Sequence, residues 1–252
     1  MLYAENTGKT KTMTTQNIMS GMDNCKWIWP VGMALSTIAF ILSLFVLFPR
    51  YIGDSAPHIV RDIAVIINYA HHWASQFFIL DITNILISLI FAKLLFILHL
   101  NNAAKAVLFI AAAYTIMLLN QFLTHFADID YHTSNAFFLI KSLIIGICSF
   151  LIFGATIYMS SILINHTGKF HKLLRILVSI FIATVVLSIL DFILVIPIFI
   201  MNLSDVGYDG YFDIQLTATT MTFKLKLVLL VVAYYFYYRL FSYAQKGIEV
   251  AN

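Results

Sequence analysis

Six runs of apolar residues, each long enough to cross a lipid bilayer, constrain this chain more than any other feature of its sequence. A hydrocarbon core about 30 Å thick needs roughly 20 residues of α-helix to span it. The runs occupy residues 27–48, 76–98, 104–123, 136–163, 173–201 and 221–241. Inside lipid each backbone amide needs a partner within its own segment, so we expect every run to be a helix.

The composition agrees with this reading. Hydrophobic residues make up 61% of the 252 residues and charged residues 11%, whereas a soluble domain is about 45–50% apolar and about 25% charged. We therefore expect an all-α, polytopic membrane protein with a polar N-terminal tail (1–26), a six-helix transmembrane domain (27–241) and a C-terminal tail (242–252).

The net charge of +3, with no basic run, argues against a nucleic-acid partner. No phosphate-binding glycine loop or nucleophile elbow is present, and we expect no cofactor.

Lysine and arginine alternate between the connections, which predicts the orientation of the chain. Connections 124–135 and 202–220 contain neither residue, whereas both tails, the connection 99–103 with its neighbour Lys105, and the connection 164–172 are basic. Positive charge stays on the cytoplasmic side. The pattern predicts cytoplasmic N- and C-termini in a bacterial inner membrane or a plasma membrane. Connection 49–75 carries Arg50 and Arg61, so its charge does not predict a side. We place it outside only because successive connections alternate between the two sides of the membrane.

That first connection contains the segment IVRDIAVIINYAHHW, residues 59–73. Its apolar residues recur at helical spacing and its polar residues fall on the other side, a pattern typical of an amphipathic helix in the membrane interface. The segment is either a simple connecting helix or a lid over a cavity between the spans.

Charged residues within the predicted spans point to a site, because an ionised group in lipid costs several kcal/mol unless it is paired or hydrated. Four of them, Asp81, Lys141, Asp191 and Lys226, lie towards the predicted outer side. They could form buried pairs that orient the helices. They could also line an outward-facing polar cavity that binds a small charged or zwitterionic ligand, or a lipid headgroup.

Other side chains in the spans suggest how the helices pack. Small polar residues within the spans indicate close packing or a wet interior. They are Thr83, Asn84, Ser88, Thr115, Asn120, Ser142, Ser149 and Thr156. Gly146 and Gly154 share a helix face that a neighbouring backbone could approach. Aromatic residues at the ends of the first and last spans predict interface belts. They are Trp27, Trp29, Tyr234, Tyr235, Tyr237 and Tyr238.

Four histidines and one aspartate on the predicted outer side form the candidate metal site. Imidazole and carboxylate groups are good ligands for divalent metals, and a metal-bound water becomes a nucleophile near neutral pH. The alternatives are a hydrated loop or a pH sensor. The candidate ligands are His71, His72, His125, Asp128 and His132.

Two resemblances follow from the layout of the spans. The segments IVRDIAVIINYAHHW, DITNILISLIFAKLLFIL and GATIYMSSILINHTGKFHKLLRILVSIF resemble an uncharacterised bacterial six-helix integral membrane family, a domain of unknown function. The segments PRYIGDSAP and YYFYYRLF, with Gly146, Gly154 and Tyr158, are similar to the Frag1/DRAM/Sfk1 family of eukaryotic membrane proteins. The second resemblance implies a role in lipid-anchor remodelling or autophagy.

Three functional hypotheses remain open. The sequence favours a non-enzymatic protein that binds or transports a small ligand or lipid through an outward-facing polar cavity. The residues expected to line that cavity are Asp81, Lys141, Asp191 and Lys226. The alternatives are a metal-dependent, membrane-embedded enzyme that uses the outer histidines, and an assembly subunit that docks onto other membrane proteins. In each case the lipid bilayer is the first partner.

Overall fold

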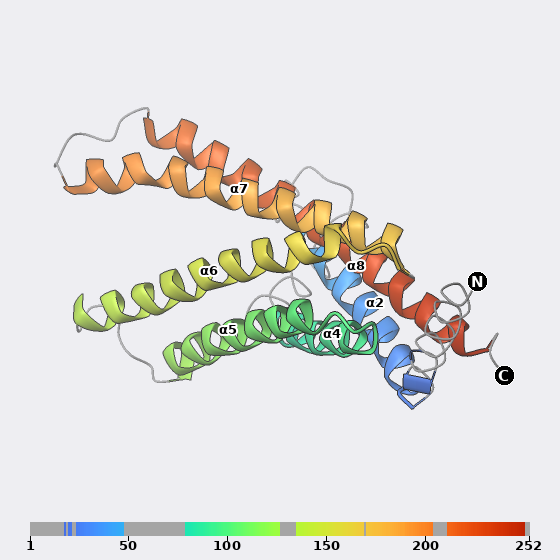
Figure 1. Cartoon of the computed structure of the whole chain (residues 1–252). Helices are drawn as coiled ribbons and strands as arrows, with labels where there is room; N and C mark the ends of the chain where they lie inside the picture. Colours follow the sequence, from blue (N-terminus) through green and yellow to red (C-terminus); the bar gives the residue numbers. More distant parts are fainter. Residues whose placement is uncertain are drawn as a thin grey trace, which may run out of the picture.

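The computed structural model describes residues 18, 20–21, 24–47, 79–126, 135–168, 170–203 and 211–249. Over these ranges the protein is helical and contains no strand. Figure 1 shows the arrangement of the long helices. They are α2 (Ile28–Leu47), α4 (Ile79–Ile97), α5 (Asn101–Phe126), α6 (Asn135–Ile164), α7 (His171–Leu203) and α8 (Tyr211–Glu249).

The helices coincide with the predicted apolar runs, and five of them, α4 to α8, contain stretches long and apolar enough to cross a membrane. This is compatible with a multi-pass membrane protein. In α2 the corresponding stretch is the shorter segment Ile28–Leu44. The amphipathic helix predicted for residues 59–73 lies outside the described residues. The sixth span and the interfacial helix therefore stay predictions. The largest difference at a helix end is in α8, which begins at Tyr211 instead of residue 221.

The six helices form a closed ring. Each helix packs against its neighbours in the chain, and α2 also packs against α8, so the order around the ring is α2, α4, α5, α6, α7, α8 and back to α2. Short connections at residues 98–100 and 165–170 force antiparallel neighbours. Figure 1 shows the start of α2 and the end of α8 close together on the right.

That end of the ring, which we call the basic end, carries most of the described lysine and arginine residues. The opposite end, the far end, is where α6 and α7 diverge in Figure 1. The charge asymmetry used to predict the orientation is therefore also an asymmetry in space. The residues that define the basic end are Lys26, Lys93, Lys105, Lys172, Arg175, Arg239 and Lys246.

The tightest packing lies in the half of the ring towards the basic end. Trp29 on α2 is fully buried and stacks on Phe241 of α8, with ring centroids 6.4 Å apart. Tyr237 also stacks on Phe241, with ring centroids 6.1 Å apart. Gly32 makes this contact possible, because a Cβ atom there would lie 2.7 Å from Cδ2 of Phe241. The ring is thus sealed where its first and last helices meet.

This packing corrects two expectations about aromatic residues and glycines. Tyr234 and Tyr237 are 1% and 9% exposed and face the interior instead of a membrane interface. Trp29 is likewise buried, whereas Trp27 is exposed. At Gly146 and Gly154 no neighbouring backbone approaches, since a Cβ atom at either position would meet nothing within 4 Å. These glycines therefore do not hold this ring together.

Candidate functional site

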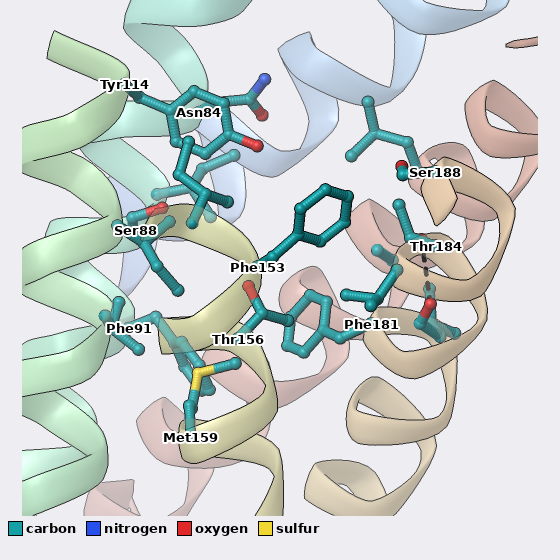
Figure 2. Close-up of a pocket in the computed structure, with 18 of the residues that line it drawn as sticks. Asn84, Ser88, Phe91, Tyr114, Phe153, Thr156, Met159, Phe181, Thr184 and Ser188 are labelled. Carbon is teal, nitrogen blue, oxygen red and sulfur yellow. Dashed lines mark hydrogen bonds between the residues drawn. The ribbon is translucent and has the colours of Figure 1, made fainter. Parts of the chain in front are cut away.

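A cavity of about 320 Å³ lies inside the ring, at the middle of the helices. Five helices line it: α4, α5, α6, α7 and α8. Figure 2 shows side chains from these helices converging on the same space, with Phe153 projecting towards its centre. A volume of this size falls at the small end of the range for sites that bind small molecules, about 300–1,000 Å³.

The polar groups that line the cavity are uncharged, and four of the five helices contribute two of them each. On each of four helices they are three, four or seven residues apart, the spacing that places side chains on one helix face. Because these faces converge, hydroxyl and amide groups surround the cavity on several sides. They are Asn84 and Ser88 on α4, Tyr114 on α5, Ser149 and Thr156 on α6, Thr184 and Ser188 on α7, and Tyr234 and Tyr237 on α8.

Apolar and aromatic side chains make up the rest of the wall. Phe91, Phe153 and Phe181 contribute three phenyl rings, which are visible around the space in Figure 2. Within the described residues, no Asp, Glu, Lys, Arg or His lines the cavity. The site can therefore contact an apolar body and hydrogen-bond its polar groups, but it offers no counter-charge.

A hydrogen bond crosses the ring at the level of the cavity. The Tyr234 hydroxyl on α8 donates to Oδ1 of Asn84 on α4. Asp81, half-buried one turn before Asn84, lies close enough to Tyr114 and Tyr234 to interact with them electrostatically. One side of the cavity thus carries polar groups from three helices, Asn84 on α4, Tyr114 on α5 and Tyr234 on α8, and a hydrogen bond joins the first and the last.

The four charged residues predicted to bind a ligand lie beyond the lining, towards the far end. Asp81 is three residues from Asn84, the outermost lining residue of α4, and Lys226 is four residues from Leu230 on α8. Asp191 is three residues beyond Ser188 on α7, and Lys141 is eight residues before Ser149 on α6. Only the backbone of Lys141 and Asp191 is described. Three of the four positions are therefore about one helical turn from the cavity.

Asp81 and Lys226 do not meet. The bond between Tyr234 and Asn84 sets the register of α8 against α4, and both helices run from the far end to the basic end. By that register Lys226 lies about 7.5 Å farther out than Asp81, at 1.5 Å per residue. Asp81 forms no ion pair in the part of the chain that the structure describes. Asp81 and Lys226 therefore lie at different heights, and pairing among the four charged residues stays a prediction.

The predicted metal site falls almost entirely outside the described residues. His71, His72, Asp128 and His132 lie there, and His125 is described only as backbone near the end of α5. Among the described side chains, no group of three His, Cys, Asp or Glu residues could hold a metal ion. The metal hypothesis for the five outer residues stays a prediction.

Family models, curated proteins and solved structures offer no match to this chain. The two family resemblances seen in the sequence stay predictions as well.

The sequence held a pattern that leads to the cavity. Small polar residues within the spans were taken to indicate close packing or a wet interior, and four of them, Asn84, Ser88, Ser149 and Thr156, line the cavity. Thr83, Thr115 and Asn120 do not line it. Thr184 and Ser188, four residues apart on α7, continue the same pattern but were not singled out. Tyr114 and Tyr234 were missed because tyrosine in a membrane protein is more often an interface residue.

Proposed function

We propose that this protein is a multi-pass membrane protein that binds a small, uncharged amphipathic molecule in the cavity inside the ring. The observation that carries the proposal is the lining: uncharged polar groups from five helices, set among phenyl rings, with no charged side chain among the described residues. The sequence predicted a charged or zwitterionic ligand. The cavity instead favours a neutral group in its interior, because an unpaired charge there would lose its hydration without gaining a partner.

The hydroxyl groups favour a ligand that can share their hydrogen bonds. Hydroxyls within a membrane helix usually bond the carbonyl one turn earlier, as Thr184 does with Ile180 at 2.9 Å. Such a hydroxyl still has lone pairs that can accept from a ligand. Apolar walls with a few convergent polar groups are typical of small-molecule sites. A molecule with an alkyl or ring body and one or two hydroxyl groups fits this chemistry.

The positions of the charged residues indicate the end of the ring from which a ligand enters the proposed site. Asp81, Asp191 and Lys226 lie on three helices between the cavity and the far end. We therefore place the entrance there, with hydrated charges around it and the neutral lining below it. Transport would need a second opening, and binding alone is the more economical proposal.

A three-compound series tests the chemistry of the ligand. Decanol, decane and decanoate share a chain length and differ only in having a hydroxyl, no polar group or a charge. Both cysteines, Cys25 and Cys148, are buried, so a thiol-reactive coumarin maleimide reports unfolding of the purified protein in detergent. At about ten times its Kd, decanol should stabilise the protein by about 1.4 kcal/mol and raise Tm by about 3–5 °C. Decane and decanoate should give smaller shifts.

A matched pair of variants separates cavity binding from effects on the detergent. Ser149→Phe places a ring in the cavity, whereas Ile147→Phe places the same ring on the exposed face of α6, where Ile147 is 52% exposed. Ser149→Phe should abolish the decanol shift and Ile147→Phe should preserve it. Equal shifts in the two variants, or a larger shift with decanoate than with decanol, would overturn the proposal.

A further inference from the structure

A second hollow lies on the outside of the ring, in the groove between α5 and α6. Its volume is about 540 Å³, and it is separate from the internal cavity. From Asn102 to Phe109 it follows about 10 Å of α5, and from Phe150 to Tyr158 about 12 Å of α6. It is therefore elongated along the helices, and it begins at the basic end.

The groove exists because one residue of α6 lacks a side chain. A Cβ atom at Gly154 would meet nothing within 4 Å, so the glycine leaves an open space between larger neighbours. Phe150, one turn away, is 80% exposed, and Phe109 faces the groove from α5. The result is an apolar channel with aromatic sides, open to whatever surrounds the ring.

The two ends of the groove differ in chemistry. At the basic end it is lined by Lys105 and Asn102, in the first two turns of α5, and by Tyr158 on α6. In the part of the chain that the structure describes, no acidic side chain lines the groove and Lys105 forms no ion pair. The first turn of a helix also presents unpaired N–H groups and the positive end of its dipole. This end is therefore suited to an anion, and the rest of the groove to a hydrocarbon chain.

We propose that the groove binds one phospholipid with an anionic headgroup, its phosphate at Lys105 and Asn102 and one acyl chain along Gly154 and Phe150. A helix from another protein is a poorer occupant, since it would have to bury an acid opposite Lys105. A membrane supplies phosphate at the level of a helix end, directly above hydrocarbon. This site is outside the ring and is independent of the internal cavity.

Lipid titration of the full-length protein in detergent, read by native mass spectrometry, tests the proposal. Phosphatidylglycerol and phosphatidylcholine with identical acyl chains are the probes. The first phosphatidylglycerol should bind about fivefold more tightly than the first phosphatidylcholine, the effect of one lysine near an anionic group. Lys105→Gln should bring this ratio close to one, and Lys105→Glu should invert it. Gly154→Leu should weaken the binding of both lipids.

The chain offers a matched control for each variant. Gly146→Leu makes the same change at a position equally open on α6 but outside the groove. Lys172→Gln removes an exposed charge from the basic end without touching the groove. Both controls should bind the two lipids as the natural chain does. The proposal fails if Lys172→Gln loses the headgroup preference as Lys105→Gln does. The preference would then come from the summed positive charge of the basic end and not from the groove. It also fails if Gly154→Leu binds lipid normally, or if that variant dissociates an oligomer, which would make the groove a protein interface.

Discussion

The hydroxyl of Tyr234 on α8 donates a hydrogen bond to Oδ1 of Asn84 on α4, although α4 and α8 do not pack directly against each other in the described part of the chain. In the ring, α2 lies between these two helices and contacts both. The bond thus ties together the second-neighbour helices on one side of the internal cavity. It also fixes the register that places Asp81 and Lys226 at different heights.

Removal of this hydrogen bond should destabilise the ring. Tyr234→Phe keeps the buried ring but leaves the Asn84 amide without its partner, which should cost about 1 kcal/mol. At this chain length the loss lowers Tm by about 2–4 °C. Tyr238→Phe, on the exposed side of the same helix, should change Tm little. A double-mutant cycle with Asn84→Ala measures the coupling, and strictly additive effects would contradict the bond.

Two glycine-to-alanine substitutions should have opposite signs. Gly32→Ala places a methyl group 2.7 Å from the Phe241 ring, which Trp29 and Tyr237 hold in place. Overpacking of this kind costs about 1–3 kcal/mol. Gly146→Ala meets nothing within 4 Å and should stabilise the helix by up to about 1 kcal/mol. Thermal unfolding compares the two, and Phe241→Leu should restore stability only in the Gly32→Ala background.

His99 occupies a position that favours glycine. It has φ 59° at the end of α4, where the N–H of Leu100 bonds the Leu95 carbonyl at 2.9 Å and the N–H of His99 bonds the Phe96 carbonyl at 3.0 Å. This is a Schellman cap with a left-handed residue at its centre. His99→Gly should relieve strain of about 1 kcal/mol, less the extra entropy of glycine in the unfolded chain. Tm should rise for His99→Gly and not for His99→Ala, and equal values would show that the backbone is unstrained.

The orientation of the chain can be tested by cysteine labelling in a Cys25→Ala/Cys148→Ala background. Thr167→Cys lies in the exposed connection between α6 and α7 at the basic end. This position is preferable to 168, where a Cβ atom would lie 2.7 Å from the His166 ring. If the basic end is cytoplasmic, an impermeant maleimide should label Asp130→Cys in intact cells and Thr167→Cys only after permeabilisation. Labelling of both from one side would refute the predicted topology.

The helices could be predicted from the sequence, but their inward faces could not. In water, polar residues identify the outer face of a helix, whereas in lipid both the core and the exterior are apolar. Phe91 is fully buried and Phe150 is 80% exposed, yet both lie within equally apolar runs. Nothing in the residue type separates these two phenylalanines. Only the packing of the neighbouring helices does so.

The cavity lies next to the charged residues predicted to bind a ligand, and their role in binding stays a prediction. Charged residues are costly in lipid. For that reason Asp81 and Lys226 were predicted to bind a ligand, and the residues with hydroxyl groups were not. The cavity lies about one turn farther in and is lined by neutral groups such as Ser88 and Thr184. Regular spacing of small polar residues on several helices was the more informative pattern. It could not be turned into a site until the order of helices around the ring was known.

Because α2 contacts α8, the ring can close only after the last helix has been synthesised. A ribosome synthesises α2 first and α8 last, so the ring has an open side until synthesis ends. Until α8 arrives, Trp29 lacks Phe241 and Asn84 lacks Tyr234. A chain that stops before α8 therefore cannot enclose the cavity, and quality-control machinery could recognise it by the uncovered face of α2.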